Sequence, residues 1–178
     1  MNKNCVQCST VSDCYTGYFA CTNNTCVCRA KSSKNLIPNA GFDTNVSGWI
    51  SQDNMATWSG VDADGCPASG SLSAPQGDVL EYCVPNVLPN TTYYLGYKYI
   101  QDQANGVDCY VTWTSDTACQ NDISKFDTLS GANTGSAWSS ASNLGTSGAG
   151  TVAAYIQCLL NATANIDQIY LSTVISGF

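Results

Sequence analysis

Short stretches in which apolar and polar residues alternate run from residue 35 to the end of the chain, separated by turn residues such as Gly, Asn, Pro and Asp. Alternation with a period of two is typical of strands that bury one face. The candidate strands are Leu36–Ile37, Asp78–Val84, Thr92–Gln101, Val107–Ser115, Gly150–Leu160 and Asn165–Val174. Because no long segment shows a helical period, these strands predict an all-β sandwich or barrel. Residues 130–150 are rich in Gly, Ser and Ala and predict a surface loop.

The same alternation assigns a buried and an exposed face to each strand. The predicted core face carries Tyr93, Leu95, Tyr97, Tyr99, Cys109, Trp113 and Cys158, and we also assign Trp49 to the core. The predicted exposed positions are Glu81, Tyr94, Lys98, Tyr110, Tyr155 and Gln157. Tyrosines therefore occur on both faces of the predicted strands, and those on the exposed face are the ones that need a further explanation.

Cysteine usage indicates the compartment in which the protein folds. The chain has 11 cysteines and no histidine, which excludes zinc sites built from Cys and His. Sites made of cysteines alone are a less favoured alternative to disulfides, because so many cysteines are typical of proteins in oxidising compartments. We therefore expect a secreted or cell-surface protein. The opening residues MNKNCVQC have no apolar run, so either a signal peptide has been removed or export follows another route.

The cysteines also divide the chain. Six fall in the first 28 residues, namely Cys5, Cys8, Cys14, Cys21, Cys26 and Cys28. A segment this short needs disulfides to hold its shape, so residues 1–30 predict a disulfide knot, 31–34 a linker and 35–178 the sandwich domain. The pattern CVQCSTVSDCYTGYFACTNNTCVC resembles the small cysteine-rich repeats of extracellular proteins, and we favour the role of a covalent staple over a binding role.

The five cysteines of the sandwich domain are odd in number. Cys109 and Cys158 both face inward and could form a bridge. If the first six cysteines pair among themselves, one of the five is left over, and Cys66 or Cys83 is the candidate. That cysteine would be a free thiol, part of an intermolecular bridge, or a partner of the N-terminal segment.

The charge pattern excludes some classes of partner. Charged residues make up only 11% of the chain, the net charge is -7, and four of the six basic residues fall in the first 34 positions. The sandwich domain therefore has no basic patch for nucleic acid or anionic lipid. No stretch approaches about 18 apolar residues, so we expect no membrane span.

The sequence also lacks the residue sets of common enzymes. Without histidine there is no His-based triad or general base, and the phosphate-binding GxxxxGK[ST] loop is absent. Only one glutamate is present, and nothing places two carboxylates across a cleft as in a glycosidase. We interpret Asp53, Asp62 and Asp64 as solvated loop residues or cation ligands, and expect no enzyme activity.

Four motifs resemble one family in the order in which that family has them. These are NLIPNAGFDTNVSGWI (35–50), ASGSLSA (68–74), LPNTTYYLGYKYI (88–100) and ANIDQIYLST (164–173). They are similar to the opening strand, a turn and strand, a middle strand and the closing strand of the jelly-roll carbohydrate-binding modules appended to xylanases and laminarinases. The resemblance implies a two-sheet antiparallel jelly-roll sandwich.

The resemblance further implies a structural calcium ion between the first and last strands. Ca²⁺ takes about 6–8 oxygen ligands, mostly carboxylates and carbonyls. The matching positions are Asn39, Asp43 and Asp167. The chain departs from the family pattern at Asp43, where the family has Glu, and at Gln168, where it has a second Asp.

Sugar binding needs aromatic rings that stack on the apolar faces of pyranoses, together with side chains that pair with their hydroxyl groups. The candidates are Trp58, Trp138, Tyr94, Tyr110, Tyr155, Lys98 and Gln157. Each of them has a competing role in core or rim packing, and Trp58 and Trp138 in particular could close the ends of the sandwich.

Two functions of different classes follow. The first is a non-catalytic extracellular module that binds a polysaccharide or glycan. The second is a self-associating structural subunit of a surface fibre, sheath or coat, which the spare cysteine and exposed edge strands of the sandwich favour.

Overall fold

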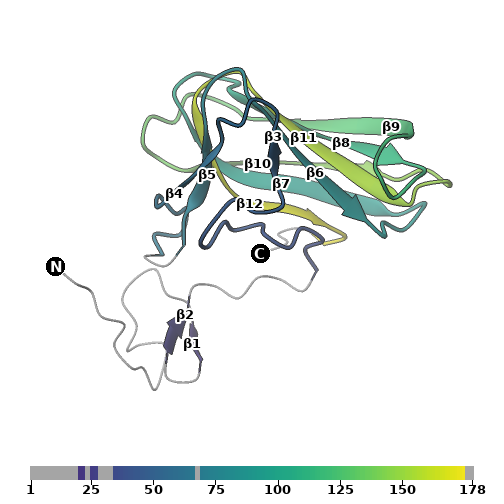
Figure 1. The fold of residues 1–178 in the computed structure, drawn as a ribbon, viewed down its shortest axis with the longest axis horizontal. Helices are drawn as coiled ribbons and strands as arrows, with labels where there is room; N and C mark the ends of the chain where they lie inside the picture. Colours follow the sequence, from purple (N-terminus) through teal and green to yellow (C-terminus); the bar gives the residue numbers. More distant parts are fainter. Residues whose placement is uncertain (1–19, 23–24, 28–33, 67–68, 175–178) are drawn as a thin grey trace.

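The computed structural model describes residues 20–22, 25–27, 34–66 and 69–174 (Figure 1). The strands are β1 (Ala20–Thr22), β2 (Thr25–Val27), β3 (Ile50–Ser51), β4 (Thr57–Ser59), β5 (Ser71–Ala74), β6 (Val79–Pro85), β7 (Thr92–Gln101), β8 (Val107–Thr114), β9 (Asp122–Leu129), β10 (Ser139–Thr146), β11 (Ala153–Leu160) and β12 (Ala164–Ser172). Within the described part of the chain, no helix has the length and apolar character needed to cross a membrane.

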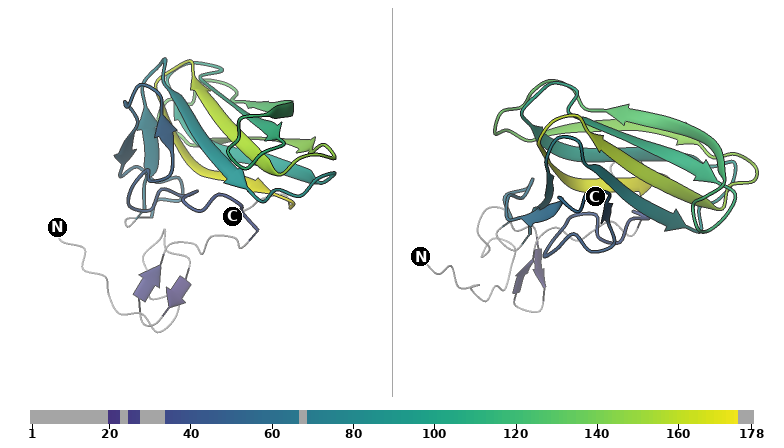
Figure 2. Two further views of the ribbon diagram at one scale, coloured as in Figure 1. Left: turned by 45° about the vertical axis from the view of Figure 1, so that its right-hand side comes forward. Right: turned by 45° about the horizontal axis from the view of Figure 1, so that its top comes forward.

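Ten of these strands form two five-stranded antiparallel sheets. One sheet has the order β10-β7-β12-β5-β4 and is called the β12 sheet after its central strand. The other, with the order β3-β6-β11-β8-β9, is the β11 sheet. The two sheets stack face to face (Figure 2). This arrangement is the two-sheet jelly-roll sandwich that the sequence predicts.

The core lies between the two sheets and is filled by the inward positions of the alternating strands. Tyr93, Leu95, Tyr97 and Tyr99 of β7 are all buried, as predicted. Trp113 is 1% exposed, and its ring lies 5.4 Å from that of Tyr93 and 5.6 Å from that of Phe126. Tilted ring pairs at these distances add to the stabilisation that apolar burial gives. Trp49 is half-buried against the same core.

The disulfides test the predictions made for the five cysteines of the sandwich. Cys109 and Cys158 are bonded and fully buried, directly opposite each other on β8 and β11. Of the two candidates for the cysteine left over in the sandwich, Cys66 is correct and Cys83 is not, because Cys83 bonds to Cys119. Cys66 is disulfide-bonded to none of the other four cysteines of the sandwich, so the alternative of a free thiol is wrong. The left-handed backbone of Cys119 lies in a loop, where alternation carries no information.

Several predicted elements differ from the observed ones. Residues 130–150, predicted as a loop, contain the strand β10. Its small residues are mostly exposed, so the strand forms through backbone pairing with β7 and not through burial of an apolar face. Leu36–Ile37 is not a regular strand, although the Leu36 amide donates to Leu171 of β12 at 2.9 Å. The predicted knot of residues 1–30 and the linker 31–34 lie outside the described residues, apart from the hairpin of β1 and β2 and residue 34.

A glycine closes one edge of the sandwich. Gly145 of β10 faces Phe126 of β9, and a β carbon at this position would overlap the phenyl ring. Gly145→Ala should therefore lower the free energy of unfolding by about 1–3 kcal/mol, since Phe126 packs on Trp113 and cannot move freely. Gly150→Ala is the matched control, because its β carbon would make only an ordinary 3.7 Å contact with Ile123. Equal urea midpoints for the two variants would contradict this packing.

Candidate functional site

The outward side of the β11 sheet gathers polar and aromatic side chains from four adjacent strands. One row across the sheet consists of four residues, each directly opposite the next: Glu81 of β6, Gln157 of β11, Tyr110 of β8 and Asp127 of β9. In the next row, Tyr155 of β11 is followed by Thr112 and then Lys125 of β9. We call the set Glu81, Tyr110, Lys125, Asp127, Tyr155 and Gln157 the β11 face. Directly opposite residues of neighbouring strands point to the same side of a sheet, so these side chains share one surface.

Glu81 is the centre of a hydrogen-bond network on this surface. Its Oε1 accepts hydrogen bonds from Gln157 Nε2 at 2.8 Å and from Gln52 Nε2 at 2.7 Å, and Tyr155 donates a further one. Partial burial raises the pKa of Glu81, but these hydrogen bonds outweigh burial and bring the pKa below its usual value. Burial and the Glu81 carboxylate raise the pKa of Tyr155, so this ring stays neutral. The network fixes the orientation of Tyr155 and Gln157.

Tyr110 stands beside a hollow of about 420 Å³. We call it the Tyr110 cavity; its lining is Asp108, Tyr110, Lys125, Phe126, Asp127 and Leu159. The Lys125 ammonium lies 5.2 Å from the centre of the Tyr110 ring. Burial, followed by the charges of Asp108, Glu81 and Asp122, raises the pKa of Tyr110. The ring is therefore a neutral platform surrounded by carboxylates.

Asp108 is the most unusual group at the Tyr110 cavity. Its Oδ1 is buried and has no hydrogen-bond partner among the described residues. Burial and then the charge of Asp127 raise the pKa of Asp108, and the ammonium of Lys125 opposes them. A buried acceptor without a donor is costly, and a ligand, an ion or water can complete such a group.

The remaining predicted sugar-binding residues lie in the β12 sheet or next to it. Tyr94 and Lys98 of β7 point outward there, and Lys98 Nζ pairs with Asp64 Oδ1 at 2.7 Å. Trp58 lies in β4 and is 42% exposed, but its Nε1 donates to the Phe42 carbonyl at 2.7 Å. Trp138 is half-buried immediately before β10. The structure thus brings Tyr110, Tyr155 and Gln157 together and places the other four predicted residues elsewhere.

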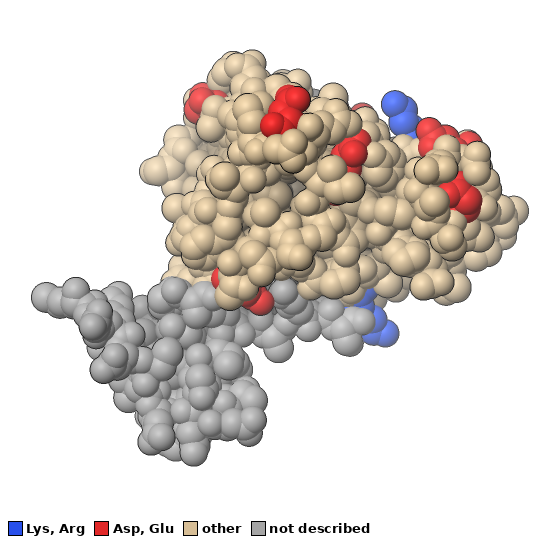
Figure 3. Space-filling view, in the orientation of Figure 1, with Lys and Arg blue, Asp and Glu red and all other residues tan. Residues whose placement is uncertain are grey.

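Sequence reasoning missed part of the site. Asp108, Lys125 and Asp127 are absent from the predicted set, and β9 is not among the expected strands. The run DISKFDTL does alternate around Phe126, with Lys125 and Asp127 on the same side as Tyr110. The signal is therefore present, but short and weakly apolar. Figure 3 shows the wider surface, on which acidic side chains are scattered over a mostly neutral area.

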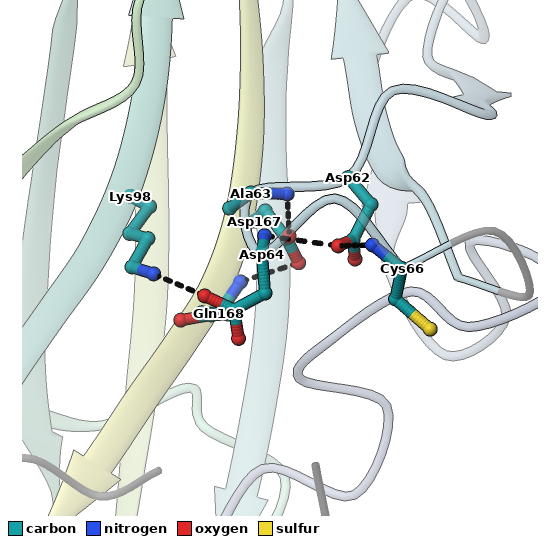
Figure 4. A network of polar contacts seen from close by, with 7 residues as sticks. All are labelled: Asp62, Ala63, Asp64, Cys66, Lys98, Asp167 and Gln168. Carbon is teal, nitrogen blue, oxygen red and sulfur yellow. Dashed lines mark hydrogen bonds and ion pairs between the residues drawn. The ribbon is translucent and has the colours of Figure 1, made fainter. Parts of the chain in front are cut away.

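Asp167, a predicted calcium ligand, is completely buried beside the loop that precedes Cys66 (Figure 4). Its Oδ2 accepts from the Ala63 amide at 2.9 Å and its Oδ1 from the Gln168 amide at 2.6 Å. Asn39 instead donates to the carbonyls of Asn45 and Ser47, and exposed Asp43 accepts from Ser69. No group of three or more carboxylate, cysteine or histidine side chains that could hold a metal lies in the described part. The calcium site remains a prediction.

The burial of Asp167 predicts a pH dependence of stability. Burial is the main cause that raises its pKa to about 7, with the charges of Asp62 and Asp64 adding to it and the two amide hydrogen bonds opposing it. Folding then takes up a proton between pH 4 and pH 7, so stability falls as the pH rises through this window. The contribution of Asp167 should make the free energy of unfolding about 2–4 kcal/mol lower at pH 8 than at pH 4.5. Urea unfolding in the presence of a chelator measures this difference.

The variant Asp167→Asn isolates this contribution from other titrating groups, including Glu81, whose lowered pKa has the opposite effect. The variant should match the wild type at pH 4.5 and exceed it at pH 8. Identical pH profiles for the two proteins would show that Asp167 stays ionised when buried.

Comparison with known proteins supports the fold. Neither a protein-family model nor a curated protein matches the sequence. Solved structures similar to it include a family 16 carbohydrate-binding module, at 20% identity and a TM-score of 0.56 over 77% of this chain and 99% of that one. The family 22 xylan-binding domain CBM22-2 from Paenibacillus barcinonensis Xyn10C has 12% identity and a TM-score of 0.58 over 76% and 98%.

A third similar structure is the enzymatically active domain of tailspike protein 4 from bacteriophage CBA120. It has 12% identity and a TM-score of 0.63 over 83% of this chain, which spans only 22% of that structure. At these identities the similarity establishes a shared jelly-roll sandwich and carries no functional residue across.

Proposed function

We propose that the sandwich is a non-catalytic carbohydrate-binding module and that the β11 face is its binding surface. One observation carries this proposal: Tyr110 and Tyr155 lie on the same outward sheet face. On that face, a hydrogen bond from Gln157 to Glu81 fixes both of these polar side chains. The rings can stack on sugar faces, while carboxylate and amide groups can pair with hydroxyls. The similar structures described as carbohydrate-binding and xylan-binding domains support this class of ligand.

The same proposal includes an extracellular setting. A disulfide between β8 and β11 and a second one between β6 and the loop after β8 favour folding in an oxidising compartment. Polysaccharides of cell walls and extracellular matrices are then the accessible ligands, which agrees with the neutral polar surface of the sandwich.

Affinity electrophoresis through gels that contain one polysaccharide each tests the proposal. The panel should include cellulose derivatives, xylan, mixed-linkage β-glucan, pectin and deacetylated chitin, with a polymer-free gel as reference. We expect retardation on at least one polymer. No retardation on any of them would overturn the proposed function.

A second candidate function is self-association into a surface assembly, and the observation that favours it is the edge strand β10. Charged residues and prolines usually protect an edge strand from pairing with another chain. The β10 sequence SSASNLGT has neither. Sedimentation at high protein concentration tests this idea: oligomers that Ser140→Lys dissolves would support it, and a persistent monomer would refute it.

A further inference from the structure

The Tyr110 cavity differs from the rest of the β11 face in its charge. Asp127 lies directly across from Tyr110 on β9, and Asp108 lies two residues before Tyr110 on β8, so that both line the cavity. Glu81 occupies the same cross-strand row as Tyr110, and Asp122 also acts on the tyrosine through its charge. Among the described residues, Lys125 is the one basic side chain that lines the cavity beside these carboxylates. This part of the surface therefore attracts cations and repels anions.

The position of Lys125 shows that an ammonium group fits beside the Tyr110 ring. The Lys125 ammonium lies 5.2 Å from the centre of the Tyr110 ring, within the distance at which a cation is attracted to an aromatic face. Lys125 is exposed and reaches this place from the edge strand β9. A ligand ammonium could occupy the same place with Lys125 swung out into solvent. The chain's own side chain thus shows which chemical group suits the position.

The unpaired oxygen of Asp108 adds an independent observation. Asp108 Oδ1 is buried without a hydrogen-bond partner among the described residues, while Glu81, in the cross-strand row of Tyr110, has three donors. A carboxylate that lacks donors gains more from a bound ammonium than one already satisfied. An uncharged sugar hydroxyl could also donate, but it would add no positive charge beside Asp108 and Asp127, whose mutual repulsion only the Lys125 ammonium opposes among the groups that act on Asp108.

We propose that the Tyr110 cavity selects a sugar with a free, protonated amino group, so that the preferred ligand of the β11 face is an amino-sugar polymer. This inference rests on the proposed carbohydrate-binding function and narrows it. The pyranose ring would stack on Tyr110 while its ammonium lies beside Asp108 and Asp127. Neutral glycans would bind more weakly, and polymers of uronic acids would be repelled.

Calorimetric titration of the full chain with glucosamine hexasaccharide and its fully N-acetylated counterpart tests the selection. The two probes differ in charge at each amino group, since acetylation removes the ammonium. We expect the free-amine oligomer to bind about tenfold more tightly at low salt, which corresponds to one or two partly screened ion pairs. The preference should shrink as salt rises, with the N-acetylated oligomer little affected.

The double variant Asp108→Asn/Asp127→Asn should bind both oligomers equally and keep its affinity for the N-acetylated one. The control Asp102→Asn removes one charge from an exposed site in the β7–β8 turn and should keep the preference, which separates the cavity from general attraction to an acidic protein. Circular dichroism confirms that the variants fold, and the salt series on the wild type tests the proposal without them.

Equal binding of the two oligomers by the wild type, or a preference that survives the double variant, would overturn amino-sugar selection. If neutral polysaccharides still bind in either case, the proposed carbohydrate-binding function stands without it. If no oligomer or polymer binds at all, both proposals fail together.

Discussion

Replacing Tyr110 and Tyr155 together by alanine should lower the affinity for any polysaccharide that retains the wild type by about a hundredfold. An aromatic ring at the centre of a binding surface commonly contributes about 1–2 kcal/mol, and each 1.4 kcal/mol is a factor of ten. The two rings lie on the adjacent strands β8 and β11, and the Glu81 network keeps Tyr155 in place before the ligand arrives. Calorimetry or quantitative affinity gels measure the loss.

Tyr94→Ala is the matched control, because this half-buried tyrosine points outward from the opposite β12 sheet. Its removal should change the affinity by less than about twofold. If Tyr94→Ala weakened binding as much as the double variant, the ligand would contact the β12 sheet and the assignment of the β11 face would be wrong.

The second large effect concerns stability. Removing the central disulfide in Cys109→Ala/Cys158→Ala should lower the free energy of unfolding by about 4 kcal/mol. The two cysteines are 49 residues apart, and a loop of that size gives about this value in the chain-entropy model of disulfide stabilisation. Both side chains are fully buried between the sheets, so the loss of packing acts in the same direction.

Urea unfolding without reductant measures this difference, with Cys83→Ala/Cys119→Ala for comparison. The second pair closes a loop of 36 residues, and Cys83 is only half-buried, so its removal should cost less. A loss below about 1 kcal/mol for the central pair would mean that the sandwich does not depend on this bridge.

Local alternation predicts the fold well where a strand is long and one face is buried. It places the tyrosines of β7 and Trp113 of β8 in the core and turns Cys109 and Cys158 inward, since burial requires the period-two pattern there. It fails for β10, whose residues are exposed on both sides and whose position depends on pairing with β7. Pairing between distant segments leaves no local pattern in such a strand.

The site is predictable only in part for a related reason. Alternation identifies Tyr94, Tyr110 and Tyr155 as outward residues, but it cannot tell which sheet a strand joins. The structure therefore separates Tyr94 from the other two. Lys98 is likewise outward, yet its ammonium pairs with Asp64, which lies 34 residues away in a loop. Such partners depend on tertiary structure and cannot be obtained from spacing along one strand.

The most direct test of the account is to map a bound oligosaccharide by NMR on the isotope-labelled chain, using an oligomer of a polysaccharide that retains the protein. We predict that amide shifts change on β6, β8, β9 and β11, centred on Glu81, Tyr110, Tyr155 and Gln157. Changes confined to β7, β12 and the loop that carries Asp64 would contradict the account, because they would place the ligand on the opposite side of the sandwich.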